Sequence, residues 1–462
     1  MAKLFGTDGP RGIAVTDLTC ELAMQTGRAA ALVLAKKGGE KTKILVGKDT
    51  RLSSDALEAA VCAGICSVGA DAELLGTVPT PAVSYLIRAR GADGGIMISG
   101  SHNSAEYNGL KLFSSKGCKL PEEAEDEIER LVLTAPEEMK LRSHDQVGRI
   151  IHGERAVAEY IARVRSLVPT DLRGMKIVLD CANGCATYTA RKIFTELGAE
   201  VIVMACRPNG TNINKSCGST NVHRLMEAVV RHGCCCGLAF DGDADRCIAV
   251  DEQGSMVDGD KQLAIFGSSM KEQGSLGKDT VVVPASSTLG LRRYAAEHGI
   301  RLVSSGAGTR YVLERMQEGG YKLGGEPDGH IIFLDDSGTG DGQLAGARLL
   351  EIMKLSGRKL SELAADIPSY PQVKLNVKIH PHYKEIWKNE KEITDLIEKH
   401  TSELGEDGRI VVRESGKEPI VRILVEGGDF ARINDMAVEI AQRIKDICAF
   451  RAERSNVKEH LI

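Results

Sequence analysis

Three aspartates that alternate with small residues form the most informative chemical pattern in this sequence. Asp241, Asp243 and Asp245 stand in the segment GLAFDGDADRCIAV, in a short loop between two apolar runs of strand character. Carboxylates crowded this closely repel one another unless a cation lies between them. Ligands that offer only oxygen suit Mg²⁺, which usually keeps its remaining positions for water or phosphate oxygens. We therefore predict that these three residues bind Mg²⁺.

A calcium-binding EF-hand loop is the alternative interpretation of the same segment. Glu252 stands at the twelfth position counted from Asp241, where an EF-hand loop has its bidentate glutamate. Arg246, however, occupies the position at which the calcium loop requires glycine, and the flanking runs are β-like rather than helical. These two features argue against an EF-hand.

A second polar segment, GIMISGSHNSAEYNGLKLF, contains a candidate nucleophile. An apolar run ends there in Ser99, Ser101, His102 and Asn103, and Lys111 follows inside a second apolar run. Two interpretations are open from these residues alone: a nucleophile exposed at a strand end, or a polar turn between two strands.

Two further glycine-containing turns have side chains suited to phosphate in one case and to sugar hydroxyls in the other. In RESGKEPIVR, guanidinium groups and a glycine turn favour a phosphate cradle, although a solvated hairpin tip fits equally well. Its candidate residues are Arg413, Ser415, Gly416, Lys417 and Arg422. In LGGEPDGHIIF, Glu326 and Asp328 stand on a tight turn that can hydrogen-bond sugar hydroxyls, and Glu326 can also pair with an amine.

The elements that must position these loops follow a repeated plan. The apolar runs KILVGKDTR, KIVLDCANG and TVVVPASST each precede a helical pattern that ends at Gly69, Gly198 or Gly299, and a second apolar run follows. Parallel strands need such helical crossovers, so we predict three α/β domains of one kind. The tail alternates in QVKLNVKI, RIVVR and VRILVEG and has a last helical pattern around 432–447, which predicts a smaller α+β domain with an antiparallel sheet.

Length and composition agree with several soluble domains. A length of 462 residues suggests about three domains. The patterns along the chain divide it into four, which we expect over 1–150, 151–253, 254–368 and 369–462. The net charge of −5 gives no reason to expect a nucleic acid partner. Neither a signal peptide nor an apolar run of membrane-spanning length is evident, so we expect a cytoplasmic protein with no membrane partner. The thirteen cysteines are irregularly spaced, which predicts reduced thiols.

Taken together, the loops resemble those of the α-D-phosphohexomutase superfamily over nearly the whole chain. LFGTDGPRG is similar to its N-terminal signature, ISGSHNSAEYNGLK to its phosphoserine loop, DGDADR to its metal loop, GGEPDGH to its sugar loop and RESGKEP to its phosphate loop. Within the superfamily, NINKSCGST, LGGE, IIFLDDSGTGDG and RYVLE are most similar to the phosphoglucosamine mutases. The resemblance implies three similar α/β domains with mixed sheets and a smaller C-terminal α+β domain around a central cleft.

The activity implied by this resemblance is interconversion of glucosamine 6-phosphate and glucosamine 1-phosphate, for UDP-N-acetylglucosamine synthesis. Ser101 would carry a phosphoryl group, and Mg²⁺ would be held by the three aspartates and an oxygen of that phosphoserine. Lys111 and Arg11 would assist proton movement. His102 would either act as a base or order the loop, and family precedent favours loop ordering.

The remaining site residues are also assigned by resemblance. Glu326, Asp328 and His330 would bind the sugar, and Arg246 would hold the metal loop or the phosphate. Arg413, Ser415, Gly416, Lys417 and Arg422 would bind the phosphate that is not reacting. Two phosphoryl transfers through a hexosamine bisphosphate are expected, on a small-molecule sugar phosphate and in a possible homodimer.

Several positions depart from the usual mutase motifs, mostly in the specificity loops. Asp328 replaces a serine, Lys417 and Thr309 replace a threonine and an aspartate, Ser104 replaces a proline and Gly100 an alanine. We hypothesise that Asp328 and Lys417 compensate each other's charge. Other possible functions are a phosphomannomutase or phosphoglucomutase, a non-catalytic sugar-phosphate sensor, and a plain Mg²⁺-dependent phosphatase.

Overall fold

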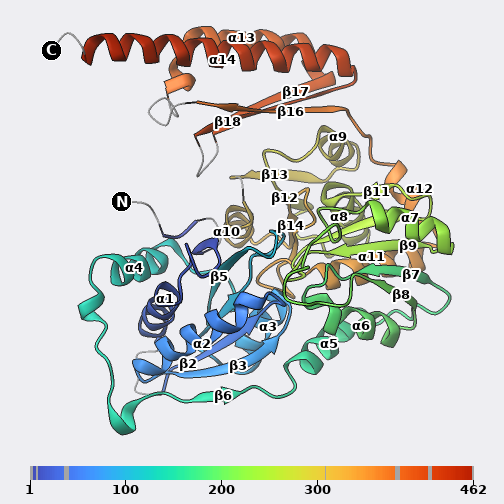
Figure 1. The fold of residues 1–462 in the computed structure, drawn as a ribbon. Helices are drawn as coiled ribbons and strands as arrows, with labels where there is room; N and C mark the ends of the chain where they lie inside the picture. Colours follow the sequence, from blue (N-terminus) through green and yellow to red (C-terminus); the bar gives the residue numbers. More distant parts are fainter. Residues whose placement is uncertain are drawn as a thin grey trace. The chain divides into compact units, whose positions relative to one another are not determined.

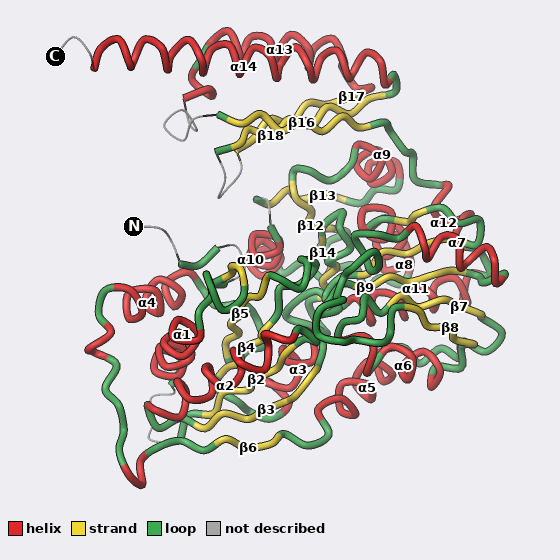
Figure 2. Tube along the Cα trace, viewed as in Figure 1, coloured by secondary structure: helices red, strands yellow, loops and turns green. Residues whose placement is uncertain are grey.

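The computed structural model shows a chain in which helices cover β-sheets (Figures 1 and 2). The structure describes residues 4–6, 9–35, 41–306, 308–379, 386–414 and 419–459. Within this part of the chain, no helix combines the length and the hydropathy required to cross a membrane.

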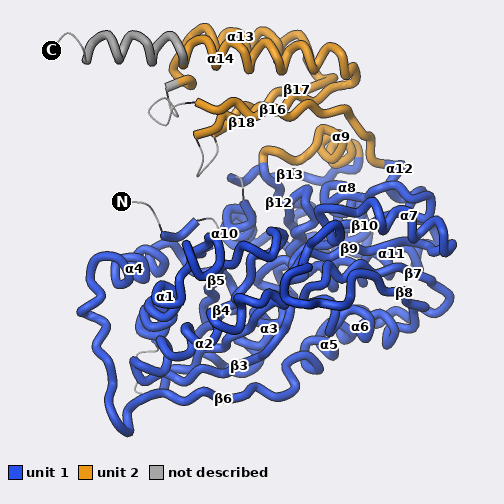
Figure 3. Tube along the Cα trace, in the orientation of Figure 1, with its two compact units in different colours: residues 1–284, 298–366 blue, residues 285–297, 367–462 orange. Residues whose placement is uncertain are grey.

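The chain divides into two compact units (Figure 3). The first unit comprises Met1–Pro284 and His298–Asp366, and the second comprises Ala285–Glu297 and Ile367–Ile462. The second unit therefore includes a short internal segment as well as the C-terminal part of the chain.

The first sheet contains the strand that leads to Ser101. Its strand order is β1-β5-β4-β2-β3-β6. The strands are β1 (Arg11–Ile13), β2 (Lys43–Lys48), β3 (Asp71–Thr77), β4 (Gly94–Ile98), β5 (Tyr107–Ser114) and β6 (Ile150–His152). Four of them run parallel, whereas β5 is antiparallel to β4 and β1 is antiparallel to β5. The sheet is mixed, as predicted.

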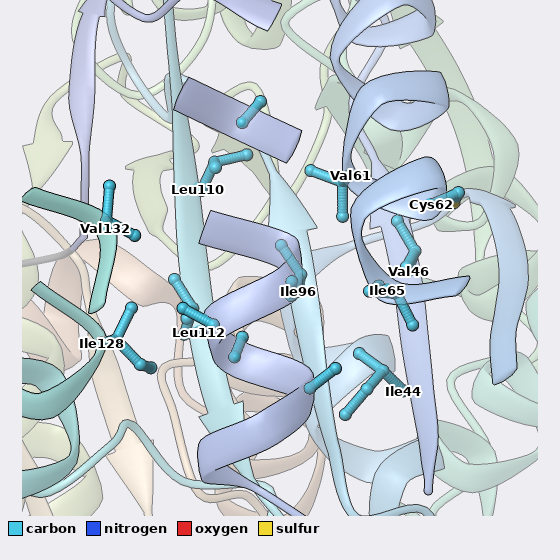
Figure 4. Packing of buried hydrophobic residues seen from close by; sticks show 14 of the residues in the cluster. Ile44, Val46, Val61, Cys62, Ile65, Ile96, Leu110, Leu112, Ile128 and Val132 are labelled. Atoms are coloured by element: carbon cyan, nitrogen blue, oxygen red, sulfur yellow. The ribbon is translucent and has the colours of Figure 1, made fainter. Parts of the chain in front are cut away.

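Four helices accompany this sheet: α1 (Cys20–Val33), α2 (Leu52–Ser67), α3 (Thr80–Ala89) and α4 (Glu122–Leu133). Figure 4 shows Ile44, Ile96 and Leu112 from the strands beside Val61 and Ile128 from the helices, all of them within one buried cluster. The apolar runs of the sequence thus form the core, and the polar residues that follow them lie at the strand ends.

The second sheet supports the acidic loop. Its order is β11-β10-β9-β7-β8, and β9 and β10 form an antiparallel pair on either side of the aspartates. The strands are β7 (Lys176–Asp180), β8 (Glu200–Met204), β9 (Cys236–Phe240), β10 (Cys247–Asp251) and β11 (Met256–Val257). The helices of this region are α5 (Ala156–Leu167), α6 (Ala190–Glu196) and α7 (His223–His232).

The third sheet supports the predicted sugar loop, which connects its last two strands. Its order is β13-β12-β14-β15. The strands are β12 (Thr280–Pro284), β13 (Arg301–Ser305), β14 (Leu323–Gly325) and β15 (Ile331–Phe333). The helices are α8 (Gly259–Glu272), α10 (Thr309–Gly319), α11 (Gly342–Ser356) and α12 (Leu360–Ala365).

The three predicted strand–helix–strand segments are confirmed. The pairs β2/β3, β7/β8 and β12/β13 are each parallel, and each pair is connected through a helix. The helix between β12 and β13, α9 (Leu289–Glu297), belongs to the second unit, although both strands belong to the first. The predicted domain boundaries stay a prediction, as does the central cleft.

The C-terminal part forms the predicted antiparallel sheet, in the order β16-β18-β17. Its elements are β16 (Gln372–Lys378), α13 (Lys391–Leu404), β17 (Gly408–Glu414), β18 (Ile420–Gly427) and α14 (Phe430–Glu459). The last helix is longer than the predicted 432–447. No glycine or proline occurs after Phe430 to end it earlier.

An ion pair with a fully buried carboxylate joins α9 to the C-terminal sheet. Glu426 is fully buried, and one of its carboxylate oxygens accepts hydrogen bonds from Arg409 Nε at 2.8 Å and from the Leu289 N–H at 2.9 Å. Arg409 also donates to the backbone carbonyls of Ala285 and Ser286, at 2.9 and 3.2 Å. These bonds hold the start of α9 to the β17–β18 pair.

We expect Arg409→Met to destabilise this attachment strongly, because it leaves the Glu426 carboxylate buried without its cation. Breaking such a pair lowers the free energy of unfolding by about 3 to 5 kcal/mol. Chemical denaturation measures this change, and hydrogen exchange should rise in α9 first.

Asp407→Asn is the matched control, because it removes an ion pair with Arg293 in which the Asp407 side chain is 89% exposed. An exposed pair contributes at most about 1 kcal/mol. Equal losses in the two variants would contradict the role assigned to the buried pair.

Candidate active site

The acidic triplet lies where β9 turns back into β10. Asp241, Asp243 and Asp245 are all buried, and one carboxylate oxygen from each lies within 4.8 Å of the others. Ala244, between the last two, has a left-handed backbone with φ +57°. This tight turn places all three alternating carboxylates on one side, as the sequence pattern predicts.

Lys111 compensates part of this buried negative charge. Its Nζ lies 2.6 Å from Asp243 Oδ2 and 2.7 Å from Asp245 Oδ2, and its side chain is 3% exposed. Lys111 is on β5, opposite Met97 of β4. A residue of the first sheet therefore contacts the acidic loop of the second sheet. These two ion pairs explain why a lysine occurs inside an apolar run of the sequence.

The environment moves the pKa values of Asp241 and Asp245 in opposite directions. Burial, together with the charges of Asp245 and Asp243, raises the pKa of Asp241 well above its usual value. Burial acts in the same direction on Asp245, but Lys111 and His330 outweigh it and hold the pKa of Asp245 well below its usual value. The site therefore favours a proton or a further cation near Asp241.

Two carboxylate oxygens of this cluster are suited to bind a magnesium ion. Asp243 Oδ1 and Asp245 Oδ1 are buried and accept no hydrogen bond within the described part of the chain. Burying a carboxylate oxygen that accepts no hydrogen bond is costly, and such oxygens are the hard ligands that Mg²⁺ prefers. The donor set thus agrees with the predicted metal.

Thr80, which the sequence analysis missed, holds one of these ligands. Its hydroxyl donates to Asp243 Oδ2, and its backbone N–H donates to the Asp243 carbonyl at 2.9 Å. Thr80 is the first residue of α3, where backbone N–H groups have no partner within the helix. The Thr-Pro pair at a helix start was the only sequence signal for it.

Ser101 follows β4 directly, and the structure brings it to the acidic triplet. Its hydroxyl donates to Asp241 Oδ2 at 2.7 Å, and the residue is 1% exposed. Its backbone is left-handed, with φ +51°, which costs a serine about 1 to 2 kcal/mol. Its N–H donates to Ser99 Oγ at 2.9 Å, and Ser99 in turn donates to buried Asp49 at 2.7 Å.

His102 and Arg11 lie beside this serine loop. Burial, with the positive charges of Arg246 and Arg11, lowers the pKa of His102 to about 4. Nδ1 of His102 is buried without a hydrogen-bond partner within the described residues. Arg11 is on β1, directly opposite Gly109 of β5, and a Cβ built at Gly109 would lie 2.8 Å from Cγ of Arg11.

Two of the predicted sugar-loop residues contact the metal loop. Arg246 pairs with Asp328 at 2.9 Å, so the aspartate that replaces the usual serine has a partner within this unit. The His330 Nε2 accepts the Gly340 N–H at 3.0 Å, which leaves its Nδ1 facing Asp245 Oδ1 at 3.6 Å. The Asp328–Lys417 pairing stays a prediction, since Lys417 lies outside the described residues.

Glu326 is the third sugar-loop residue. Burial and the neighbouring Asp328 raise its pKa above the usual value. Gly329, three residues on, has φ +88°, and a Cβ there would lie 2.3 Å from the Cys247 carbonyl. The close approach of the loop to β10 therefore depends on this glycine.

The predicted phosphate loop belongs to the second unit. Arg413 of β17 and Arg422 of β18 stand directly opposite each other in the antiparallel register. Ser415, Gly416 and Lys417 lie outside the described residues. Paired guanidinium groups at one end of a hairpin suit an anion.

Comparisons with known proteins agree with this arrangement. Four domain models match in chain order: "phosphoglucomutase/phosphomannomutase, alpha/beta/alpha domain" I over 2–139, II over 158–254 and III over 258–370, and the C-terminal domain of the same family over 375–443. The three α/β regions and the smaller C-terminal region are thus those of one family.

Among solved structures, a phosphoglucomutase/phosphomannomutase family protein from Burkholderia thailandensis has a TM-score of 0.80 at 24% identity and covers 96% of this chain and 97% of its own. N-acetylphosphoglucosamine mutase from Aspergillus fumigatus has a TM-score of 0.67 at 17% identity, with 96% of each chain covered. At these identities the two structures support the fold.

Curated relatives are much closer in sequence. A phosphoglucosamine mutase from Clostridium acetobutylicum is 50% identical over 96% of this chain and 99% of its own length. Another, from Acetivibrio thermocellus, is 47% identical over the same shares. The chain belongs to the phosphoglucomutase/phosphomannomutase family of phosphohexomutases and, within it, to the phosphoglucosamine mutases.

Proposed function

We propose that this protein interconverts glucosamine 6-phosphate and glucosamine 1-phosphate by way of a phosphoserine at position 101. The observation that carries the proposal is the Ser101 hydroxyl, 2.7 Å from Asp241 in a buried triplet of carboxylates. Relatives named phosphoglucosamine mutase at 47 to 50% identity support the sugar. The Aspergillus neighbour was solved with GlcNAc-6P and magnesium, which supports the ligand class.

In the first transfer, a sugar hydroxyl attacks the phosphorus of phospho-Ser101. The bond between phosphorus and Ser101 Oγ breaks, the hydroxyl loses its proton, and the product is a sugar bisphosphate. Lys111 and Arg11 assist this proton movement, and the serine oxygen recovers a proton. In the second transfer, the Ser101 oxygen loses its proton and attacks the other phosphorus of the bisphosphate, the bond between that phosphorus and the sugar oxygen breaks, and the sugar oxygen takes up a proton.

Asp241, Asp243, Asp245 and a phosphoserine oxygen would hold Mg²⁺, which neutralises charge on the transferring phosphoryl group when bound. Thr80 and His330 orient two of these carboxylates from outside the ligand set. The chain's own contribution is thus mainly the positioning of charged groups in a buried site.

The sugar loop and the phosphate loop supply recognition. The Glu326 carboxylate is suited to the ammonium group of glucosamine, and His330 is held by the Gly340 N–H beside it. Arg246 neutralises Asp328, so this substitution does not leave a free negative charge against an anionic substrate. Arg413, Ser415, Gly416, Lys417 and Arg422 would hold the phosphate that is not reacting. A homodimer and a location in the cytoplasm stay predictions.

A substrate panel tests the proposal. With a trace of sugar bisphosphate as primer, we expect kcat/KM for glucosamine phosphate to exceed that for glucose or mannose phosphate by at least tenfold, because only the amino sugar offers an ammonium group to Glu326. A preference for mannose or glucose phosphate would instead indicate a phosphomannomutase or phosphoglucomutase. Free phosphate released in step with substrate loss would indicate a phosphatase.

Intact-mass measurement tests the phosphoserine. We expect a fraction of the protein to be about 80 Da heavier, the mass of one phosphoryl group, because Ser101 carries it covalently. Ser101→Ala should lose both this fraction and turnover, whereas Ser99→Ala keeps the heavier fraction. A heavier fraction that persists in Ser101→Ala would show that another residue carries the group.

A comparison of Lys111→Met with His102→Gln separates the two candidates for proton handling. Lys111 contacts the carboxylates, whereas burial lowers the pKa of His102 to about 4 and its Nδ1 makes no hydrogen bond to any described residue. We expect kcat at saturating Mg²⁺ to fall about 10²- to 10⁴-fold in Lys111→Met and less than about tenfold in His102→Gln. The reverse order would assign the base to His102.

A further inference from the structure

The backbone carbonyl of Ser101 is held as closely as its hydroxyl. Because Ser101 is left-handed, its carbonyl turns away from the strand direction of β4, and it needs partners outside the sheet. Those partners are the side chains of two residues that the proposed mechanism does not use, Arg51 and Asn214.

Arg51 binds the serine loop from within the first domain. Its Nη2 donates to the carbonyls of Ser101 at 3.0 Å and Asn103 at 2.8 Å, and its Nη1 donates to the Ser104 carbonyl. Its Nε pairs with Asp49 at 2.8 Å, and both side chains are fully buried. Asp49 also accepts the Ser99 hydroxyl, so one buried ion pair reaches both sides of Ser101.

Asn214 binds the same two carbonyls from the loop between β8 and α7. Its Nδ2 donates to Ser101 O at 2.8 Å and to Asn103 O at 2.9 Å. Asn214 is itself left-handed, with φ +57°, a conformation that asparagine tolerates. Its own N–H donates to the Ala182 carbonyl at 2.9 Å, which anchors the loop to the second domain.

The metal loop closes the remaining side of this carbonyl. A Cβ at Gly242 would lie 2.7 Å from Ser101 O and 3.1 Å from Asn214 Nδ2. The serine loop, the Asn214 loop and the metal loop therefore meet at one carbonyl oxygen. With the N–H of Ser101 held by Ser99, rotation of the side chain is the main freedom left to this residue.

We propose that Asn214, together with Arg51, is a positioning residue for phosphoryl transfer: it holds the left-handed backbone of Ser101 and so directs the Ser101 oxygen at the acidic triplet. The expected effect on phosphoryl transfer rests on the proposed function, whereas the fixing of the Ser101 backbone does not depend on it. Arg51 is the poorer test, because its removal leaves Asp49 buried without a cation.

The test uses Asn214→Asp and Asn214→Gly in the full-length protein. Aspartate keeps the shape but replaces the donor with an acceptor, and glycine removes the side chain but accepts the positive φ. Asn212→Asp is the matched control, because Asn212 Nδ2 donates to the Arg207 carbonyl at 3.0 Å, within the same loop.

Hydrogen exchange is measured first, on the unphosphorylated protein. We expect exchange of the backbone amides of residues 99–104 to rise at least tenfold in both Asn214 variants, and to be unchanged in Asn212→Asp. Unchanged exchange in the Asn214 variants, or an equal rise in the control, overturns the inference whatever the enzyme's substrate.

Single-turnover transfer from phospho-Ser101 to glucosamine 6-phosphate is measured next by rapid quench. Misplacement by about 1 Å costs up to about 10²-fold, so we expect the rate constant to fall 10- to 100-fold and the half-saturating sugar concentration to change less than twofold. Loss of folded protein would lower the amplitude and leave the rate constant unchanged. A wild-type rate constant in both variants overturns the inference. A wild-type phosphoenzyme that transfers to no sugar phosphate refutes the proposed function, and the exchange result still decides the positioning role.

Discussion

Buried negative charge is the constraint on which the site depends. Three carboxylates within 4.8 Å of one another are unfavourable unless positive charge and hydrogen-bond donors surround them. Lys111 from the first sheet, Thr80 at the start of α3 and His330 from the sugar loop meet this requirement from distant parts of the sequence. The acidic loop of the second sheet therefore depends on contacts from the first and third sheets as well as on its own turn.

The same logic explains why strain is tolerated at Ser101. Its left-handed backbone is unfavourable by itself, yet its N–H, its carbonyl and its hydroxyl each have a partner. The Arg246–Asp328 pair ties the sugar loop to the metal loop in a similar way. This ion pair therefore connects the predicted sugar loop directly to the acidic loop.

Local patterns were enough to predict the strand–helix–strand segments, the antiparallel C-terminal sheet and the acidic triplet, because each depends on residues close in sequence. Asp241, Asp243 and Asp245 are recognisable by spacing alone, and Ser101 by its motif. Thr80, Arg51 and Asn214 were not predicted, since their importance comes from partners 50 to 163 positions away. For Asp328, opposite charge in loops expected to meet over one ligand suggested Lys417, whereas the structure pairs Asp328 with Arg246, 82 positions earlier in the sequence, counted as 328 minus 246.

The attachment of α9 to the C-terminal sheet affects how this protein can be recombined. Arg409 and Glu426 bind backbone groups of residues 285, 286 and 289, which lie far upstream of the segment that begins at Ile367. A chimera that exchanges only the contiguous C-terminal region with a homologue would bring a foreign sheet against the native helix. These bonds are retained in a chimera when residues 285–297 come from the same parent as the C-terminal region.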